Sequence, residues 1–303
     1  MDPKLASSKQ RLDVWAMAIL VILCISWGVQ QVSIKVALEG VSPMLQSGIR
    51  SIGATALLWI WMVIRRESLF EQDGTLWWGL VAGLMFAAEF LLLYLGLGYT
   101  NASRSTVFLY TSPFVVALGA QWFIPGERLT MIQIAGLCCA FTGIIFAFSE
   151  SLALPTYRML IGDALVLAGG IIWGATTVLI KASPLATTKP SKTLFYQLAV
   201  SAIVLTLGSL VIDEQGIFAM TPLIAGCLVY QIVWVAFITY LTWFWLIRSY
   251  PASRLAAFTF LTPLFGVVAG GLHLNEPITN LLLLALILVG AGIYMVNYPA
   301  PKR

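Results

Sequence analysis

Runs of about 20 apolar residues recur along the whole 303-residue chain. A run of this length allows a helix to cross a hydrocarbon core roughly 30 Å thick. The chain is 60% hydrophobic and 10% charged, whereas soluble domains average about 25% charged residues. We therefore expect an all-α membrane protein with ten spans, at about 14–36, 43–64, 77–98, 103–123, 131–148, 160–181, 193–212, 222–247, 253–273 and 278–298.

One sequence pattern occurs twice, half a chain length apart. The residues that recur at an offset of 150 or 149 are Ala102/Ala252, Ser103/Ser253, Arg104/Arg254, Phe108/Phe258, Pro113/Pro263, Glu127/Glu276 and Gly143/Gly292. A second repeated pattern places Lys35 eight residues after Trp27, and Lys181 eight residues after Trp173. We therefore expect an ancestral duplication, with one five-helix repeat in residues 1–150 and another in residues 151–303.

The lysines and arginines are distributed unevenly between the loops. If the N-terminus is cytoplasmic, 13 of the 17 fall in cytoplasmic segments and three in outer segments. The positive-inside rule therefore predicts that both termini are cytoplasmic. Five spans per half make the second half enter the membrane from the opposite face, so we expect inverted repeats around a central cavity. The first apolar run is too long for a signal peptide, and we interpret it as a span.

Several classes of function lack support in the sequence. There is no nucleic-acid-binding motif and no single basic face, so nucleic acid is not an expected partner. The four cysteines and one histidine have no metal-site spacing, and no G-x-x-x-x-G-K-[ST] stretch predicts ATP hydrolysis. We expect no catalytic residue, no metal and no cofactor. The expected partners are the lipid bilayer and a small-molecule substrate, and the oligomeric state stays open.

Motifs at corresponding places in the two halves resemble a known family. They are Trp-Gly pairs in spans 1 and 6, Pro113…Gly126-Glu127-Arg128…Gly136…Gly143, and Pro263…Asn275-Glu276-Pro277…Gly290…Gly292. Over nearly the whole chain they resemble the EamA-type repeat of the drug/metabolite transporter (DMT) superfamily, most of all the bacterial amino-acid exporters of the YddG kind. The resemblance implies a multi-pass protein of the bacterial inner membrane. It also implies that spans 1–4 and 6–9 enclose the cavity, while spans 5 and 10 lie at the periphery.

A carboxylate near the middle of the third span is the first candidate for a functional group. Glu89 stands among apolar residues, and such a group usually faces a cavity and serves a function. We expect it to contact a substrate amine or to carry a coupling proton. The alternative is a protonated Glu89 that joins two helices by a hydrogen bond. Glu89 aligns with Thr239 in the second half, so an acidic site would be present in one half only.

Two spans carry a repeated polar and aromatic face. Spacing of i, i+4, i+8 keeps these side chains on one side of a helix: Trp27, Gln31 and Lys35, with Gln30 beside them, and Trp173, Thr177 and Lys181. A tryptophan wall with amide groups suits a zwitterion that has a sizeable side chain. The two lysines are secondary candidates, because lysine at a span end commonly extends to the membrane interface.

Aromatic residues in two other spans are further candidates for the cavity wall. Aromatic belts normally lie at the ends of a span, so mid-span tyrosine and tryptophan need another explanation. We expect a substrate-facing wall, and helix packing is the alternative. The residues are Tyr230, Trp234 and Phe237 in the eighth span, and Phe86, Tyr94 and Tyr99 in or near the third.

Pairs of equivalent residues are candidates for gating. Pro113 and Pro263 each remove a helical hydrogen bond in mid-span, which favours hinges or static bends. Arg104 and Arg254 lie near the expected gates, where a structural role is the favoured one. Arg50, deep in the second span, needs a partner or water and is a secondary candidate.

Other recurrent residues have structural explanations. Glu127 and Glu276 open spans 5 and 10, where a carboxylate favours the positive end of its helix. Gly136, Gly143, Gly290 and Gly292 permit close helix packing. His273, the only histidine, is expected at the membrane interface.

The sequence thus predicts a secondary transporter that exports small metabolites by alternating access, with aromatic or neutral amino acids as the expected substrates. The direction follows from the family resemblance alone. An exporter of drugs, nucleotides or sugar derivatives is the alternative, and an integral-membrane enzyme is a more distant one. No spaced cluster of carboxylates or histidines supports the enzyme.

Overall fold

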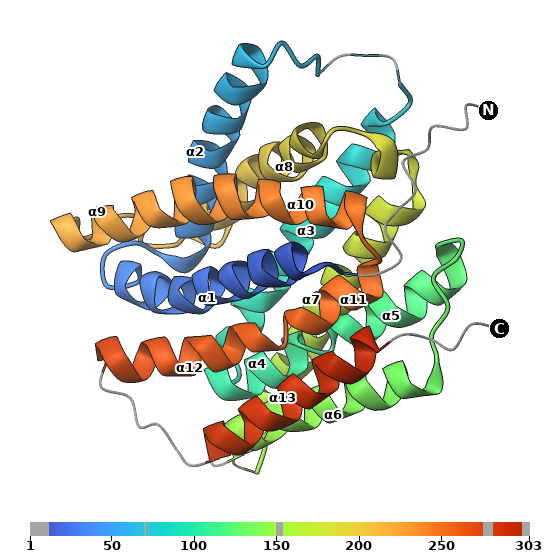
Figure 1. Cartoon of the computed structure of the whole chain (residues 1–303). Helices are drawn as coiled ribbons and strands as arrows, with labels where there is room; N and C mark the ends of the chain where they lie inside the picture. Colours follow the sequence, from blue (N-terminus) through green and yellow to red (C-terminus); the bar gives the residue numbers. More distant parts are fainter. Residues whose placement is uncertain (1–11, 70, 72, 150–153, 275–280, 299–303) are drawn as a thin grey trace.

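The computed structural model describes residues 12–69, 71, 73–149, 154–274 and 281–298. Within these residues the regular structure is helical, apart from one isolated antiparallel bridge between Val41 and Ile217. The elements are α1 (Val14–Ala37), α2 (Pro43–Ile64), α3 (Leu76–Leu97), α4 (Ala102–Leu109), α5 (Ser112–Phe123), α6 (Met131–Phe148), α7 (Tyr157–Ala182), η2 (Pro184–Thr187), α8 (Pro190–Val211), α9 (Pro222–Val229), η3 (Tyr230–Thr239), α10 (Tyr240–Ser249), α11 (Ala252–Phe258), α12 (Leu261–Leu274) and α13 (Leu281–Asn297) (Figure 1).

These helices make up the expected ten spans. Nine described segments are long and apolar enough to cross a membrane, and α13 is a shorter apolar helix of 17 residues. Three spans consist of pieces: α4 with α5, α9 with η3 and α10, and α11 with α12. The all-α membrane architecture with ten spans is confirmed. Because the spans alternate in direction, α1 begins and α13 ends at the same end of the bundle, here called the terminal end.

The packing of the spans is reciprocal between the two halves. Spans 2 and 7 pack together as α2 and α8, and spans 5 and 10 as α6 and α13. Span 3 packs on span 6 (α3 on α7), and correspondingly span 8 packs on span 1 (α9 and η3 on α1). Span 4 packs on span 6, and span 9 on span 1. This pairing supports the proposed inverted halves, whose boundary near residue 150 lies outside the described residues.

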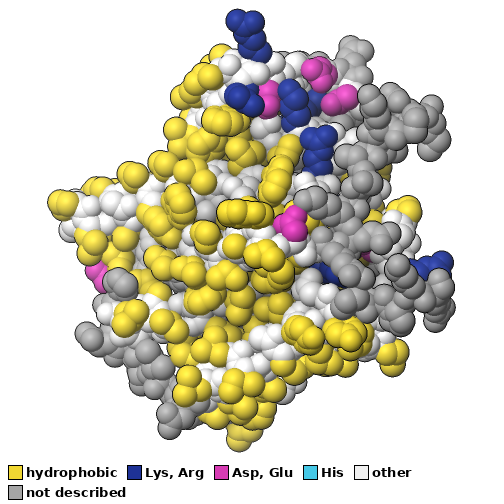
Figure 2. All heavy atoms as spheres, in the orientation of Figure 1, with side chains coloured by type: hydrophobic (Ala, Val, Ile, Leu, Met, Phe, Trp, Pro, Cys, Tyr) yellow, Lys and Arg dark blue, Asp and Glu magenta, His cyan; other side chains and the backbone are white. Residues whose placement is uncertain are grey.

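The outer surface suits a lipid environment. Large apolar side chains are exposed on most helices, among them Trp59, Trp122 and Leu283. Figure 2 shows hydrophobic side chains over most of the visible face, with charged groups gathered near its margins. A soluble protein rarely exposes contiguous apolar patches of this extent. The chain is therefore built to be surrounded by acyl chains.

Glycines allow α6 and α13 to pack closely. A Cβ atom added to Gly136 would lie 2.7 Å from the Gly292 carbonyl oxygen, and one added to Gly292 would lie 2.4 Å from the Gly136 carbonyl oxygen. Gly143 likewise faces the backbone of α13, 2.9 Å from the Ala285 carbonyl oxygen. The expectation for Gly290 was wrong, because a Cβ atom there meets nothing within 4 Å. Gly290 and Gly292 are two residues apart, so they lie on different sides of the helix.

Spans 4 and 9 are interrupted at equivalent places. The first break separates α4 from α5 at residues 110–111, and the second separates α11 from α12 at residues 259–260. Pro113 and Pro263 follow these breaks, in the first turns of α5 and α12. Proline is well tolerated there, because the first amide groups of a helix have no intrahelical partner. The expected bends are therefore present, and their use as hinges stays a prediction.

Span 8 contains ten residues of π-helix, η3, between two stretches of α-helix. The equivalent part of span 3 is regular α-helix throughout α3. A π-helix has i→i+5 hydrogen bonds and is rare, and it is frequently found at functional sites. Its wider turns change which side chains share a face, and this change affects the site described below.

Carboxylates from one half stabilise helix ends in the other. Glu214 accepts hydrogen bonds from the amides of Met44 and Leu45, in the first turn of α2. Glu127 accepts from the amides of Ala252 and Ser253, at the start of α11. Glu127 was expected at the start of its own next helix, α6, whose first turn is capped by Thr130 instead. Glu127 is able to cap α11 because this helix follows Pro251 and has no side-chain cap of its own.

The loop between α2 and α3 is tied to the start of α8. The Lys192 ammonium lies 2.7 Å from an Asp73 carboxylate oxygen, and the Thr75 hydroxyl donates to the other oxygen at 2.6 Å. The hydrogen bond from Lys192, and then that from Thr75, lower the pKa of Asp73 to about 2. Ser191 donates to Glu67 in the same loop. These contacts hold α2, α3 and α8 together at the terminal end.

Candidate functional site

A cavity of about 190 Å³ lies between the two halves of the bundle. It is bounded mainly by α1, α3, α7 and α10, with contributions from α4, α8 and α12. Its lining residues are Trp27, Gln30, Gln31, Ile34, Phe86, Glu89, Phe90, Leu93, Tyr94, Leu97, Leu109, Tyr110, Trp173, Thr176, Thr177, Ile180, Gln197, Tyr240, Trp243, Phe244 and Thr262.

The lining is built from equivalent positions of the two halves. On α1 and α7 the offset is 146 residues, and on α3 and span 8 it is 150 residues. The pairs are Trp27/Trp173, Gln30/Thr176, Gln31/Thr177, Ile34/Ile180, Phe90/Tyr240, Leu93/Trp243 and Tyr94/Phe244. The same faces of the two repeats therefore meet across the cavity.

Interlocked aromatic rings form the rigid part of the wall. The Trp27 indole donates a hydrogen bond to the Thr239 hydroxyl at 2.9 Å, and its ring meets Trp243 edge-on at 5.5 Å between centroids. On the other side, Trp173 meets Tyr110 edge-on at 5.8 Å. Such edge-to-face pairs contribute about 0.5–1.5 kcal/mol each beyond the area they bury. The rings therefore give the cavity a defined shape.

Three lining residues have a buried polar atom with no hydrogen-bond partner among the described residues, and one of these atoms is the Thr262 hydroxyl oxygen, which can donate as well as accept. The other two are Oε2 of Glu89 and Oε1 of Gln197, on α3 and α8. An unsatisfied polar group in a low-dielectric interior costs about 1–3 kcal/mol, and an ionised carboxylate costs more. Both atoms are hydrogen-bond acceptors when Glu89 is ionised. Residues of the cavity wall therefore have acceptor atoms that a donor group can satisfy.

Arg50 stands behind the cavity wall. Its side chain is 1% exposed, lies 4.5 Å from the centroid of the Phe90 ring, and donates to the Ser47 hydroxyl at 3.1 Å. It is near enough to Glu89 to interact with it electrostatically, although it does not line the cavity. A buried cation beside a buried carboxylate stabilises the charged form of the carboxylate. Burial acts in the opposite direction, because a low-dielectric interior favours the neutral carboxyl group.

Most of the candidate substrate residues come together in this cavity, and four do not. Those that line it are Trp27, Gln30, Gln31, Phe86, Glu89, Tyr94, Trp173 and Thr177. Those outside the lining are Tyr99, Tyr230, Trp234 and Phe237. Tyr99 is 43% exposed in the turn after α3, with the Arg158 guanidinium 5.3 Å from its ring centroid. These four therefore do not line the cavity in this structure, and a role for them in substrate binding stays a prediction.

The π-helix explains why the three candidates in span 8 lie outside the lining. Tyr230, Trp234 and Phe237 share a face only if the helix has 3.6 residues per turn, whereas all three lie in η3. Tyr230 and Trp234 instead donate hydrogen bonds to the Ser26 carbonyl and hydroxyl oxygens on α1, both at 2.9 Å. Phe237 meets Trp61 of α2. These side chains fasten span 8 to its neighbours.

Three aromatic residues of α10 that were not among the candidates line the cavity from span 8. Tyr240, Trp243 and Phe244 of α10 are the counterparts of Phe90, Leu93 and Tyr94 on α3. The repeat itself therefore contained the signal, since the same offset of 150 relates all three pairs. Nothing in the spacing of α8 distinguished Gln197 from its polar neighbours.

The secondary lysine candidates lie near opposite ends of the bundle. Lys181 donates to the carbonyl oxygens of Ile247 and Tyr250, at 2.5 and 2.6 Å, and so satisfies the end of α10. A lysine at a helix C-terminus also interacts favourably with the helix dipole. Lys35, its counterpart near the end of α1, is exposed. Lys181 thus links α7 to the turn between spans 8 and 9.

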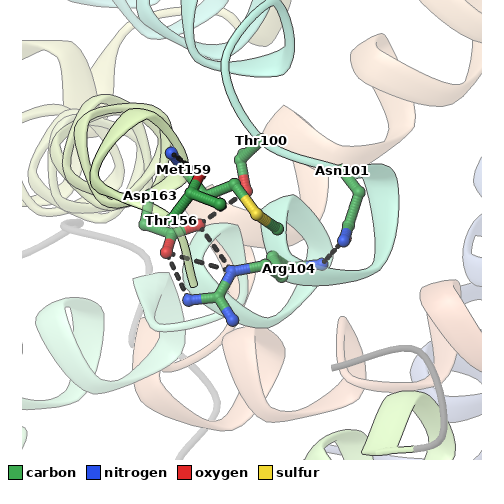
Figure 3. Close-up of polar contacts among 6 residues, drawn as sticks. All are labelled: Thr100, Asn101, Arg104, Thr156, Met159 and Asp163. Atoms are coloured by element: carbon green, nitrogen blue, oxygen red, sulfur yellow. Dashed lines mark hydrogen bonds and ion pairs between the residues drawn. The ribbon is translucent and has the colours of Figure 1, made fainter. Parts of the chain in front are cut away.

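Arg104 forms a buried ion pair with Asp163, at the end opposite the terminal end (Figure 3). Its Nη2 lies 2.5 Å from Asp163 Oδ2, and its Nε donates to both carboxylate oxygens at 3.1 Å. Thr100 donates to Asp163 Oδ1 at 2.8 Å, and Asn101 caps α4 by accepting from the Arg104 amide. Arg254, at the terminal end, donates to the Asn297 carbonyl oxygen at 3.5 Å.

The described residues hold no group of three or more histidine, cysteine, aspartate and glutamate side chains able to bind a metal ion. The four cysteines, all described, are free thiols rather than disulfides. The side chain of His273 and the whole of Glu276 lie outside the description.

A central cavity lined by equivalent faces of two helical halves matches a known group of membrane proteins. The pattern of the EamA-like transporter family matches residues 14–149 and again residues 160–298. The chain belongs to the EamA-like transporter family. Transport across a membrane is therefore the activity of its relatives, and the matched segments fall one in each half.

Individual proteins are similar to this chain over almost its whole length. The chain is 27% identical to a probable amino-acid metabolite efflux pump of Escherichia coli K12, over 92% of this chain and 93% of that protein. It is also 27% identical to the transporter YvbV of Bacillus subtilis, over 92% and 90%. A solved crystal structure shares the fold, with a TM-score of 0.81 at 15% identity, covering 94% of this chain and 96% of the other.

Proposed function

We propose that this EamA-like transporter exports small zwitterionic metabolites, with neutral or aromatic amino acids as the substrates, across a bacterial inner membrane. The unpartnered acceptors Glu89 Oε2 and Gln197 Oε1 carry the proposal. A substrate ammonium group would donate to both atoms and remove the cost of leaving them unsatisfied. The substrate carboxylate would then accept from the amide or hydroxyl groups of Gln30, Gln31 and Thr177, which line the same cavity.

The size of the cavity supports a small substrate. Pockets for drug-sized ligands span about 300–1,000 Å³, and this cavity has about 190 Å³. Nucleotides and sugar phosphates would require cationic groups in the lining, and Arg50 lies behind it. The names of two relatives, from Escherichia coli and Salmonella typhimurium, supply the amino-acid class and the outward direction.

Alternating access would follow from the two inverted halves. Spans 3–4 and 8–9 would move against spans 1 and 6, with the interruptions before Pro113 and Pro263 as hinges. The asymmetric distribution of lysine and arginine supports cytoplasmic termini. Glu89 then faces one compartment at a time, so it is suited to bind substrate or a proton in turn.

Transport by the purified protein tests this proposal. Proteoliposomes are loaded with radiolabelled leucine, phenylalanine or glutamate, and efflux is measured with and without unlabelled competitors. Efflux of neutral amino acids is expected, and the Glu89→Gln variant should lose at least about tenfold in apparent affinity. The Glu39→Gln variant removes an exposed carboxylate at the end of α1 and is the matched control.

Three results would contradict the proposal. Unchanged affinity in Glu89→Gln, with unchanged response to pH, would remove Glu89 from the site. Competition by N-acetylated amino acids as strong as by the free ones would show that the ammonium group is not recognised. Efflux of nucleotides or drugs without any amino-acid efflux would favour the alternative substrate class.

A further inference from the structure

Two buried ionisable groups of the first half have neutral counterparts in the second half. The helices α2 and α8 are both 22 residues long and both begin with proline, at an offset of 147 residues (190 − 43). This offset pairs buried positions with buried positions along both helices: Met44/Ser191, Gln46/Thr193, Ser47/Leu194, Arg50/Gln197, Ser51/Leu198, Ala54/Ser201, Leu58/Leu205 and Met62/Ser209. Arg50 therefore corresponds to Gln197. Glu89 of α3 corresponds to Thr239 of span 8, at the offset of 150 that relates these two spans.

The neutral counterparts fit the same places in the helix packing. Gln197 and Thr239 are each 1% exposed, as Arg50 is. The packing of this fold therefore accommodates uncharged side chains at both positions. A charge within a membrane span is costly, and where a chain retains one it usually serves a function. Arg50 thus needs an explanation beyond packing.

Arg50 has little compensation for a buried guanidinium group. It donates to the Ser47 hydroxyl, while its Nε has no hydrogen-bond partner and it forms no ion pair among the described residues. The ring of Phe90 lies against it, 4.5 Å from the guanidinium carbon to the ring centroid, and Phe90 lines the cavity. The positive charge of Arg50 therefore stands directly behind the wall and acts on the contents of the cavity without touching them.

Few other charges lie near the contents of the cavity. Among the described lining residues Glu89 is the one carboxylate, and none is a lysine, arginine or histidine. Arg50 is the cation that interacts electrostatically with Glu89. Lys35 and Lys181 lie outside the lining, toward opposite ends of the bundle. The tyrosines of the lining are neutral phenols at physiological pH.

We infer that Arg50 makes the carrier select a zwitterion against a cationic amine of the same shape. With Arg50 and ionised Glu89, a bound zwitterion brings the sum of charges to zero (+1 − 1 + 1 − 1), whereas a bound amine leaves +1 (+1 − 1 + 1). A protonated Glu89 would raise both sums by one and leave their order unchanged. The inference rests on the proposed function, since it takes the substrate ammonium group to be bound at Glu89.

An uncompensated charge is much more costly in a low-dielectric site than in water. The carboxylate of a zwitterion would be attracted by Arg50, and an amine would bring a second positive charge with nothing to balance it. Arg50 is therefore a repulsive element against cations, which is a common way to obtain specificity. Because it does not contact the ligand, it discriminates by charge and not by shape.

Binding of matched ligand pairs tests the inference. Phenylalanine differs from phenethylamine by its carboxylate alone, and leucine differs from isoamylamine in the same way. Purified protein in dodecyl maltoside is heated with increasing concentrations of each ligand, and the stabilisation gives the dissociation constant. The wild type should bind each amino acid at least about tenfold more tightly than its amine. Arg50→Gln, which introduces the residue of the second half, should shift this ratio by about tenfold or more toward the amine.

Two control variants separate the charge of Arg50 from its packing. Arg50→Lys alters the hydrogen bonds but keeps the charge, so it should keep the preference for the amino acid. A merely structural Arg50 would instead weaken both ligands in parallel. Arg65→Gln removes an exposed cation at the end of the same helix, α2, and should leave the ratio unchanged. An unshifted ratio in Arg50→Gln, or an equal shift in Arg65→Gln, would overturn the inference.

The same measurements distinguish failure of the two proposals. Absence of amino-acid binding to the wild type would overturn the proposed function and the inference with it. Binding of amino acids with an unshifted ratio in Arg50→Gln would overturn the inference alone.

A stability comparison covers the case in which Arg50→Gln does not fold. Glu89→Gln leaves Arg50 without the carboxylate that compensates it, and Arg50→Gln added to this variant removes the remaining buried charge. The double variant then has neutral side chains at both positions, as the second half has. It should unfold at a higher temperature than Glu89→Gln alone. A lower unfolding temperature of the double variant would show that Arg50 serves packing, and would overturn the inference.

Discussion

Replacing Gly292 by alanine should weaken the packing of α13 on α6, whereas the same change at Gly290 should not. The added Cβ at position 292 would lie 2.4 Å from the Gly136 carbonyl oxygen and 2.6 Å from the Ala140 amide nitrogen. Ordinary contact begins at 3.4 Å, so the helices must separate by about 1.0 Å (3.4 − 2.4) or distort. Backbone atoms of a helix cannot rotate away as a side chain can, so the strain is not relieved locally.

The magnitude follows from a comparison of the two variants. Both changes gain about 1 kcal/mol in helix propensity, which cancels in the difference. Overpacking of a well-packed contact costs about 1–3 kcal/mol. Gly292→Ala should therefore be about 1–3 kcal/mol less stable than Gly290→Ala, where the new methyl group meets nothing within 4 Å.

Unfolding in mixed micelles measures this difference. The purified variants are titrated with sodium dodecyl sulfate in dodecyl maltoside, and tryptophan fluorescence reports unfolding of a chain with 11 tryptophans. Gly290→Ala serves as the internal control for the propensity change. Equal stability of the two variants would refute the view that backbone contact at Gly292 sets the distance between α6 and α13.

Three further predictions concern the helix ends and the loop between α2 and α3. Lys181→Met should leave two carbonyl oxygens at the end of α10 unsatisfied and destabilise the chain by about 1–3 kcal/mol, while Lys181→Arg should retain most of the stability; SDS titration measures both. Glu127→Gln should speed hydrogen exchange at the amides of residues 252 and 253 by about tenfold, and unchanged exchange would show that the carboxylate does not cap α11. Asp73 has a lowered pKa, so its ion pair stabilises the fold fully above about pH 4 and progressively less as the pH falls toward 2. Asp73→Asn should therefore be less stable than the wild type at pH 6, and the two should converge near pH 2; a constant difference would contradict this.

The sequence contained enough information for the architecture, because crossing a membrane imposes long apolar helices on any chain that does it. It also located the polar faces of α1 and α7, since i, i+4 spacing holds in a regular α-helix. Trp27 and Trp173 accordingly line the cavity from equivalent positions. The breaks in spans 4 and 9 were expected from proline, and the helices end just before it.

The register of span 8 could not be predicted in the same way. A π-helix depends on packing against neighbouring spans, and no residue type within Tyr230–Thr239 indicates it. The partners of Glu127 and Lys181 were missed for a related reason, since both act on helix ends that are distant in sequence.

The wide turns of η3 have no equivalent in α3, and this difference makes the two halves energetically distinct. A carrier made of identical halves would be degenerate, with its inward-facing and outward-facing forms equally populated in a symmetric environment. In the proposed alternating-access cycle, an exchange of conformations between the halves would not regenerate the starting structure unless the π-helix of span 8 also passed to span 3. Under that proposal the inward-facing and outward-facing forms would differ in free energy, and the unloaded carrier would favour one of them at rest.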